Sequence, residues 1–195
     1  PDKQLVVRNL GWSADTITTR LRSLNYQDHG QTLADHQPDI ILAFFGFNES
    51  FAGPAGVDEF QQDLTAFLAD LRELKYPHRT FRRDGGEEVN DGSGSAATAP
   101  QIVLISPIAN ENLPERSLRA ADLNNENLRL YTAAMREVAA SEGVTFVDLF
   151  TPTAALMSQR QQPLTINGCH LNEDGDSHVA AILDEALFGE RQRGT

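Results

Sequence analysis

Residues 39–45, Asp39-Ile40-Ile41-Leu42-Ala43-Phe44-Phe45, decide the fold class of this chain. The run is apolar from Ile40 onward and stops at Gly46. Unbroken apolar strands are typical of parallel sheets that are covered on both faces, so we expect a central parallel strand here. Three further runs predict buried strands, at residues 5–7, 101–105 and 144–149.

Amphipathic segments lie between these runs. In residues 57–74 and 124–142, apolar residues recur at helical spacing, and Gly143 ends the second segment. A weaker helical pattern covers residues 16–24, and a last helix is expected at 177–187. Strands that alternate with helices predict an α/β fold with a mostly parallel sheet, in which ligands bind at the carboxyl ends of the strands.

The length of 195 residues fits one domain, residues 1–195. Residues 77–100 are rich in Gly, Ser, Asp and Arg and have almost no large apolar residues, which predicts a mobile surface insertion. The formal net charge of −12 repels phosphate backbones and anionic lipid. We therefore expect neither nucleic acid nor an anionic membrane as a partner, and no apolar run reaches the roughly 18 residues of a membrane helix.

No cofactor is expected from the sequence. The single cysteine, Cys169, cannot form an internal disulfide or a multi-cysteine metal site. A Gly-rich phosphate loop, a metal triad and a dinucleotide fingerprint are all missing from the sequence. His29, His36, His78 and His178 have no ligand-like spacing and are expected at the surface.

Three polar segments follow expected strands or occupy the last loop, where an open α/β sheet carries its functional groups. They are residues 9–16 (Asn-Leu-Gly-Trp-Ser-Ala-Asp-Thr), 46–49 (Gly-Phe-Asn-Glu) and 167–172 (Asn-Gly-Cys-His-Leu-Asn). Each is weak alone. Asn48 suits a turn, a lone His170 is more often a polar residue without catalytic function, and residues 13–16 suit a helix cap.

In this order and spacing, the three segments resemble the conserved blocks of SGNH (GDSL-type) hydrolases. Residues 9–16 are similar to the second block, N-x-G-x-S-G-D-T, residues 46–49 to the third, G-x-N-D, and residues 167–170 to the fifth, D-x-x-H. The resemblance implies a three-layer α/β/α sandwich of the flavodoxin-like kind. It also implies acyl transfer by a serine nucleophile, a histidine base and an oxyanion hole.

Carried over residue by residue, the resemblance gives four site residues. His170 takes the role of the base and Asn167 orients it. The side chain of Asn48 and the backbone N–H of Ala14 take the roles of oxyanion donors. Ala14 stands where the family has Gly, and we expect this replacement to keep the donor provided that φ is negative there.

The sequence departs from the family pattern at the nucleophile and at the acid. Gly-Asp-Ser occurs only at Gly175-Asp176-Ser177, after His170, where we expect Ser177 to be an N-cap or first-turn residue rather than the nucleophile. Asn167 replaces the usual Asp and cannot stabilise an imidazolium as a carboxylate does. Glu49 replaces the Asp of the third block, a change expected to be tolerated.

A narrower resemblance links the runs at residues 6–16, 41–53 and 163–176 to the SGNH-like domain of large exported proteins of planctomycete-type bacteria. There the domain is joined to a dehydrogenase-like β-propeller and a haem-binding segment, which implies an extracytoplasmic location and partner domains in the same polypeptide. The haem and its redox chemistry do not carry over, because those domains are absent from this sequence.

Two functions remain open at this stage. The first is hydrolysis of an acyl or acetyl ester, with a small molecule or a carbohydrate as substrate and a nucleophile outside residues 1–195. The second is a non-catalytic module that binds a ligand such as a glycan. In the family, the strand that carries the serine lies centrally in the sheet, so we expect about 25–40 further residues upstream, the length of one strand–helix unit.

Three other places are weaker candidates. Phe51 could contact a ligand or serve packing alone, and Asn110-Glu111-Asn112 could face the cleft. Asp148 ends an expected strand, where a cap or turn role is favoured over catalysis.

Overall fold

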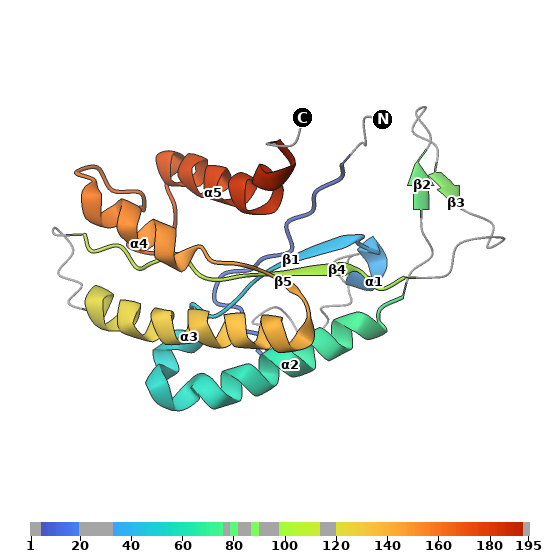
Figure 1. The fold of residues 1–195 in the computed structure, drawn as a ribbon, viewed down its shortest axis with the longest axis horizontal. Coiled ribbons are helices and arrows are strands. Elements are labelled where there is room, and N and C mark those ends of the chain that lie inside the picture. Colours follow the sequence, from blue (N-terminus) through green and yellow to red (C-terminus); the bar gives the residue numbers. More distant parts are fainter. Residues whose placement is uncertain are drawn as a thin grey trace.

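The computed structural model describes residues 5–19, 33–75, 79–81, 87–89, 98–113 and 120–192. Its main sheet consists of β1 (Ile40–Phe44), β4 (Gln101–Ile105) and β5 (Thr145–Val147), in the order β1-β4-β5. All three strands are parallel, with Ile40 opposite Gln101 and Val103 opposite Thr145. Their carboxyl ends therefore lie at one end of the sheet (Figure 1).

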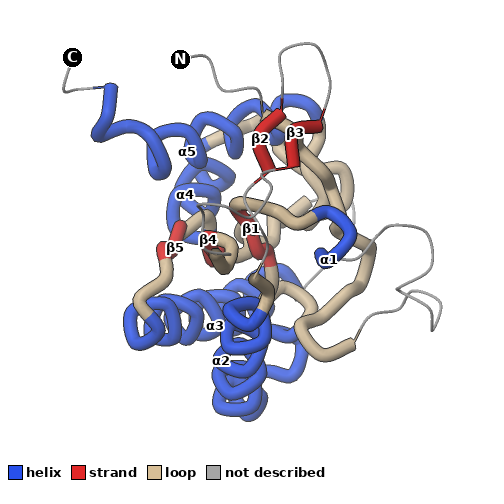
Figure 2. Tube along the Cα trace, turned by 90° about the vertical axis from the view of Figure 1, so that its right-hand side faces the viewer, coloured by secondary structure: helices blue, strands red, loops and turns tan. Residues whose placement is uncertain are grey.

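Helices cover the sheet from two sides. α2 (Val57–Glu73) and α3 (Ala120–Glu142) lie on one side, and α4 (Phe150–Gln159) and α5 (Glu173–Gln192) lie on the other (Figures 1 and 2). Two short elements flank β1: α1 (Leu33–His36) precedes it, and a 3-10 helix, η1 (Glu49–Gly56), follows it. The α/β fold with a parallel sheet is thus confirmed. No helix in the described part of the chain has both the length and the apolarity to cross a membrane.

β4 is the strand that is buried on both faces. Ile102 and Leu104 pack into the larger core, under α2 and α3, whereas Val103 and Ile105 pack into a second cluster with α5. The larger core also contains the fully buried side chains Leu64, Leu68, Tyr131 and Met135. The alternation of side chains along one strand thus joins the two layers of helices to the sheet.

The prediction that residues 39–45 form a central strand covered on both faces is wrong for this structure. Among the described residues β1 pairs only with β4, and Ile40, Leu42 and Phe44 are 55%, 47% and 52% exposed. Ala43 on the other face is only 4% exposed, because it packs under the α2–α3 layer. Within the described part of the chain, β1 is therefore an edge strand with one exposed apolar face.

The N-terminal segment also differs from expectation. Leu5, Val6 and Val7 form no strand and are 81%, 61% and 83% exposed. Residues 16–19 are not helical, and the rest of the expected helix at 16–24 lies outside the described residues. A short apolar run forms a strand only when a neighbouring strand accepts its hydrogen bonds, and none is adjacent here among the described strands.

Other boundaries shifted by a few residues. The strand expected at 144–149 is limited to β5, and α4, with Pro152 in its first turn, was not predicted. α5 begins at Glu173, earlier than expected, because the Asn172 side chain accepts a hydrogen bond from the N–H of Gly175 at 2.9 Å. Ser177 is therefore inside the helix and is not its N-cap.

The expected insertion at residues 77–100 contains a small antiparallel hairpin. β2 (Arg79–Phe81) pairs with β3 (Glu87–Val89), with Arg79 opposite Val89. Most of the other residues of this stretch lie outside the described part, so the mobility of the insertion stays a prediction.

Ala14 has an unusual backbone conformation. It occupies the third position of a turn that is closed by a hydrogen bond from the Asp15 N–H to the Trp12 carbonyl at 3.3 Å, and its φ is +65°. A positive φ at this position is the feature that favours glycine in type II turns. The condition set for Ala14, a negative φ, is thus not met: Ala14 keeps its backbone N–H but holds it at a positive φ, and this left-handed conformation costs roughly 1–2 kcal/mol for a residue with a Cβ.

Replacing Ala14 with Gly is expected to stabilise the protein. Relief of the left-handed strain exceeds the entropy that the extra freedom of Gly adds to the unfolded chain, leaving a gain of about 0.5–1 kcal/mol in the free energy of unfolding. Urea unfolding followed by circular dichroism measures this gain. The matched control is Ala133→Gly on the exposed face of α3, which should lose about 1 kcal/mol. Equal losses in both variants would contradict the strain at Ala14.

Candidate active site

The candidate site lies at the carboxyl ends of the strands. Residues 46–49 follow β1 directly, and residues 160–172 join α4 to α5 at the same end of the sheet (Figure 1). Residues 12–17 reach this end as well, since their backbone is bonded to residues 48 and 49. The structure therefore brings the first two of the three sequence segments into direct contact and places the third at the same edge.

Glu49 joins the first two segments. One carboxylate oxygen accepts a hydrogen bond from the N–H of Ile17 at 2.9 Å, and the other accepts from the N–H of Gly46 at 2.8 Å. Asn48 adds a third bond, in which its side-chain Nδ2 donates to the carbonyl oxygen of Asp15 at 3.0 Å. The turn after β1 and the loop that carries Ala14 thus form one hydrogen-bonded unit.

Gly46 is required at the start of this turn. Its φ is +101°, and a Cβ there would lie 3.3 Å from both Met135 Sδ and Pro107 Cγ. Strand β1 therefore turns tightly over the α3 side of the core, which places Asn48 directly beyond the end of the strand.

Two hydrogen-bond donors of this unit remain available to a ligand. The amide nitrogen of Asn48 carries two protons, and the carbonyl of Asp15 accepts only one of them. Within the described residues no acceptor is bonded to the N–H of Ala14. These are the two groups for which sequence comparison implies oxyanion binding.

His170 is held by Asn167, three residues earlier. Asn167 Oδ1 accepts a hydrogen bond from the backbone N–H of His170 at 2.9 Å. Both ends of the same amide lie beside the ring: Oδ1 is 3.0 Å and Nδ2 is 2.9 Å from His170 Nδ1. Nδ1 therefore faces Asn167, and within the described residues Nε2 has no bonded partner and is left toward solvent.

The amide of Asn167 does not fix one tautomer of the ring. Its oxygen can accept a proton from Nδ1, which leaves the Nε2 lone pair free to take up a proton. Its nitrogen can instead donate to an unprotonated Nδ1, and the ring proton then resides on Nε2. A carboxylate offers only the first arrangement, because it accepts hydrogen bonds and donates none.

Cys169 is also close to the ring. Its Sγ lies 3.2 Å from His170 Nδ1 and 3.5 Å from Asn167 Oδ1. Burial raises the pKa of the Cys169 thiol, so the thiol stays protonated at neutral pH. Cys169 therefore contacts the imidazole as a neutral group and not as a counter-ion.

Asn110 and Glu111, which follow β4, contact the loop that carries His170. Asn110 Nδ2 donates to the carbonyl of Gly168 at 2.7 Å, and the Glu111 carboxylate accepts hydrogen bonds from the N–H groups of Leu164 and Thr165. The alternative that these side chains face a cleft is not what the structure shows, and only Asn112 is exposed. Sequence reasoning missed this contact because it joins segments about fifty residues apart.

The remaining candidate residues are Ser177, Asp148 and Phe51. Ser177 Oγ donates to the carbonyl of Glu173 within α5, as a helical hydroxyl does. Asp148 accepts hydrogen bonds from the N–H of Thr151 at 2.9 Å and from Arg136, so its expected capping role is confirmed. Phe51 is 67% exposed, with one edge against the ring of Phe47.

Neither of the other two histidines in the described part of the chain, His36 and His178, belongs to a metal site. His36 ends α1, and His178 lies beside Arg160 and Asp174 on α5 and the loop before it. His29 and His78 lie outside the described residues. In the described ranges no three His, Cys, Asp or Glu side chains are grouped as metal ligands would be.

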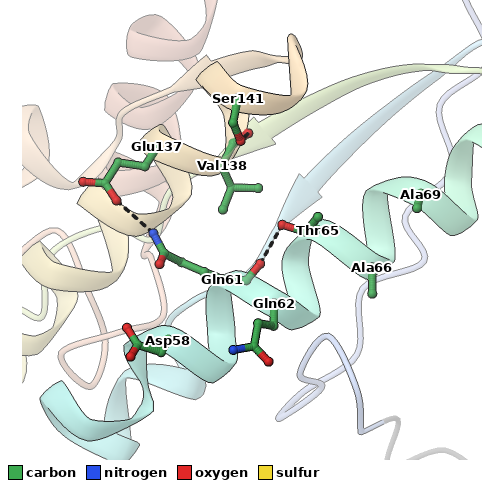
Figure 3. A pocket seen from close by; sticks show the side chains of 9 residues that line it. All are labelled: Asp58, Gln61, Gln62, Thr65, Ala66, Ala69, Glu137, Val138 and Ser141. Carbon is green, nitrogen blue, oxygen red and sulfur yellow. Dashed lines mark hydrogen bonds between the residues drawn. The ribbon is translucent and has the colours of Figure 1, made fainter.

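A shallow hollow between α2 and α3 is separate from this site (Figure 3). Gln61 crosses it and donates to Glu137 at 2.9 Å, while the hydroxyl of Thr65 donates to the backbone carbonyl of Gln61. The hollow contains no histidine and lies along the outer helices, away from the carboxyl ends of the strands. We therefore assign no chemistry to it.

Comparison with solved structures identifies enzymes with the same fold. One is a catalytic mutant of Axe2, an acetylxylan esterase from Geobacillus stearothermophilus, at 14% identity and a TM-score of 0.53, covering 77% of this chain and 60% of that one. Another is the acetyl xylan esterase AlAXEase, at 18% identity and a TM-score of 0.52, covering 78% and 69%. A third is BT4096, a gut microbial diltiazem-metabolizing enzyme, at 16% identity and a TM-score of 0.53, covering 77% and 33%.

At these identities the likeness shows the fold alone, and this chain spans less than two thirds of the length of the first of these enzymes. No curated protein matches the chain. The model of the GDSL-like lipase/acylhydrolase family, however, matches residues 2–177, which is most of the chain. Together with the parallel α/β sheet, this match shows that the chain belongs to the GDSL-like lipase/acylhydrolase family.

Proposed function

We propose that this protein hydrolyses an acyl ester, with His170 as the general base and with the Asn48 side chain and the Ala14 N–H as oxyanion donors. The observation that carries the proposal is the pair of hydrogen bonds in which Glu49 accepts from the N–H of Ile17 and the Asn48 amide donates to the carbonyl of Asp15. It holds two N–H donors that no acceptor in the described part of the chain uses, at the sheet end where the His170 loop also lies. Preorganised donors of this kind are the largest single contribution to acyl-transfer catalysis in many enzymes.

The proposed reaction has two steps. A serine hydroxyl attacks the ester carbonyl while His170 Nε2 takes its proton, and the negative charge on the carbonyl oxygen is bound by the two donors. The tetrahedral intermediate then expels the alcohol, which receives that proton from His170. Water repeats the sequence on the acyl-serine, releasing the carboxylic acid and restoring the serine.

The nucleophile in this proposal lies outside residues 1–195. The hydroxyl of Ser177 bonds within α5, which argues against Ser177 as the nucleophile. The edge of β1 that does not pair with β4 supports this placement, since an apolar edge strand is a template for a further strand. A strand added there in parallel would end beside Gly46 and Asn48, at the point where a nucleophile is needed.

The proposed substrate is an acetyl or other acyl ester, with a carbohydrate as one possible alcohol. Two of the solved enzymes with this fold are acetylxylan esterases. Catalytic mutants of one of them replace a serine, an aspartate and a histidine, and the aspartate lies three positions before the histidine. Asn167 and His170 have this same spacing, which supports the role proposed for the pair.

Hydrolysis of p-nitrophenyl acetate by the polypeptide encoded by the gene tests the proposal. We expect turnover, with a loss of at least about 100-fold in kcat for His170→Ala, because a positioned base contributes roughly 10²–10⁴. His178→Ala is the matched control, since His178 lies on α5 beside Arg160 and should leave kcat unchanged. A fluorophosphonate should label one serine, which peptide mass spectrometry would locate outside residues 1–195. Absence of both turnover and labelling would refute the esterase and favour a binding module.

Replacing Asn167 with Asp is expected to raise kcat at neutral pH by about tenfold or more. The carboxylate selects the Nδ1–H tautomer and stabilises the imidazolium that forms during proton transfer; the reverse change in serine proteases costs about 10⁴. Asn112→Asp is the control, because it adds the same charge to an exposed residue beside Glu111. Equal kcat values for Asn167→Asp and the parent would show that Asn167 does not limit the base.

A further inference from the structure

We infer that Glu111, Thr165 and Asn110 are positioning residues that set the place of the His170 ring. This inference rests on the proposed function, because it assigns to these residues a part in presenting the base. None of the three carries a reacting atom, and they act through the peptide groups of the loop that bears His170.

The Gly168 residue is the point at which they act. Its N–H donates to Thr165 Oγ1 at 3.0 Å, and its carbonyl accepts from Asn110 Nδ2 at 2.7 Å and from the N–H of Glu111 at 2.8 Å. Gly168 lies between Asn167 and His170, so fixing both of its polar groups fixes the turn that directs the ring. A Cβ at Gly168 would lie 2.9 Å from Asn110 Nδ2, which leaves no room for another residue at its φ of +94°.

Glu111 holds the opposite side of the same turn. Its side chain is only 6% exposed, and its carboxylate accepts hydrogen bonds from the N–H of Leu164 at 2.9 Å, the N–H of Thr165 at 2.8 Å and the Thr165 hydroxyl at 2.5 Å. Burying a carboxylate is costly unless hydrogen bonds replace its water. Here the N–H groups of Leu164 and Thr165 and the Thr165 hydroxyl replace that water. These bonds to the Glu111 carboxylate favour the observed conformation of the loop.

Thr165 connects the two sets of contacts. Its hydroxyl donates its one proton to Glu111 and uses a lone pair to accept from Gly168. Removing only this oxygen therefore breaks the link between the buried carboxylate and the Gly168 turn without changing the shape of the side chain. Valine has that shape, and serine keeps the hydroxyl.

Asn124 and Ser50 lie between Asn110 and the turn that carries Asn48. Asn124 Nδ2 lies 3.5 Å from Asn110 Oδ1, and Asn124 Oδ1 lies 3.2 Å from Ser50 Oγ. Ser50 Oγ in turn donates to the carbonyl of Phe47 at 2.6 Å. Asn124 and Ser50 are buried, so polar contacts join the loop of the base to the turn that carries an oxyanion donor through the interior.

Kinetics of the Thr165→Val and Thr165→Ser pair test the inference. We expect Thr165→Val to lower kcat on p-nitrophenyl acetate by about 10- to 100-fold with KM within about threefold, since a small misplacement of a catalytic group has effects of this size. Thr165→Ser should stay within about threefold of the parent in both constants. Glu111→Gln, which places an amide against the loop donors, should lower kcat in the same direction as Thr165→Val.

Leu68→Ala separates positioning from loss of stability. Leu68 is fully buried on α2, so this variant unfolds more readily, yet its kcat should equal that of the parent at temperatures where both are folded. A similar fall in kcat for Leu68→Ala and Thr165→Val, or an unchanged kcat in Thr165→Val, would overturn the inference.

If the parent protein hydrolyses no ester, the proposed function fails and the inference is judged by crystal structures of the parent and Thr165→Val. A shift of the His170 ring relative to Asn48 is the expected result. Rings that superimpose within coordinate error would overturn the inference independently of activity.

Discussion

The hydrogen bonds accepted by the Glu49 carboxylate are the interaction on which the proposed oxyanion side of the site depends. Loop 12–17 contains no regular structure, and its N-terminal neighbours Leu5–Val7 are exposed, so its position depends on contacts with residues outside a regular element. Glu49 uses one oxygen for the loop and the other for the N–H of Gly46, and Asn48 adds its bond to Asp15. Ile17, the one buried residue of the loop, packs into the main core directly beside this contact.

The loop that carries His170 is held in a different way from the loop that carries Ala14. The His170 loop is held by hydrogen bonds to the buried carboxylate of Glu111, which water does not reach. The loop of Ala14 is held by the carboxylate of Glu49, whose bond to Ile17 is only partly buried. Hydrogen bonds are stronger when shielded from water, so the contacts of Glu111 define the geometry of His170 more firmly than exposed contacts could. We infer that these contacts set the position of the ring, whereas the amide of Asn167 leaves its tautomer unselected.

The sequence was sufficient for the strand and helix order but not for partners across the fold. The strand predicted at residues 101–105 has the same bounds as β4. A short apolar run lies there between Pro100 and Pro107, which limit it at both ends. β1 is also a short apolar run, and composition cannot show that one of its faces has no covering layer among the described residues. Ala14 carries no signal of a positive φ, since alanine normally avoids it. The role of Glu111 depends on a loop more than fifty residues away, which periodicity and local motifs do not reveal.

Three of the departures from the family pattern, at Ala14, Glu49 and Asn167, act on different parts of the proposed reaction. Ala14 costs conformational energy but keeps the N–H, and Glu49 keeps both acceptor oxygens on a side chain one methylene longer than Asp. Neither change removes an oxyanion donor. Asn167 retains its hydrogen bonds to the loop and to the ring but lacks the charge that stabilises an imidazolium. In the proposed reaction the weakness of this site thus lies in proton transfer, because the two proposed oxyanion donors, the Asn48 amide and the Ala14 N–H, are both retained.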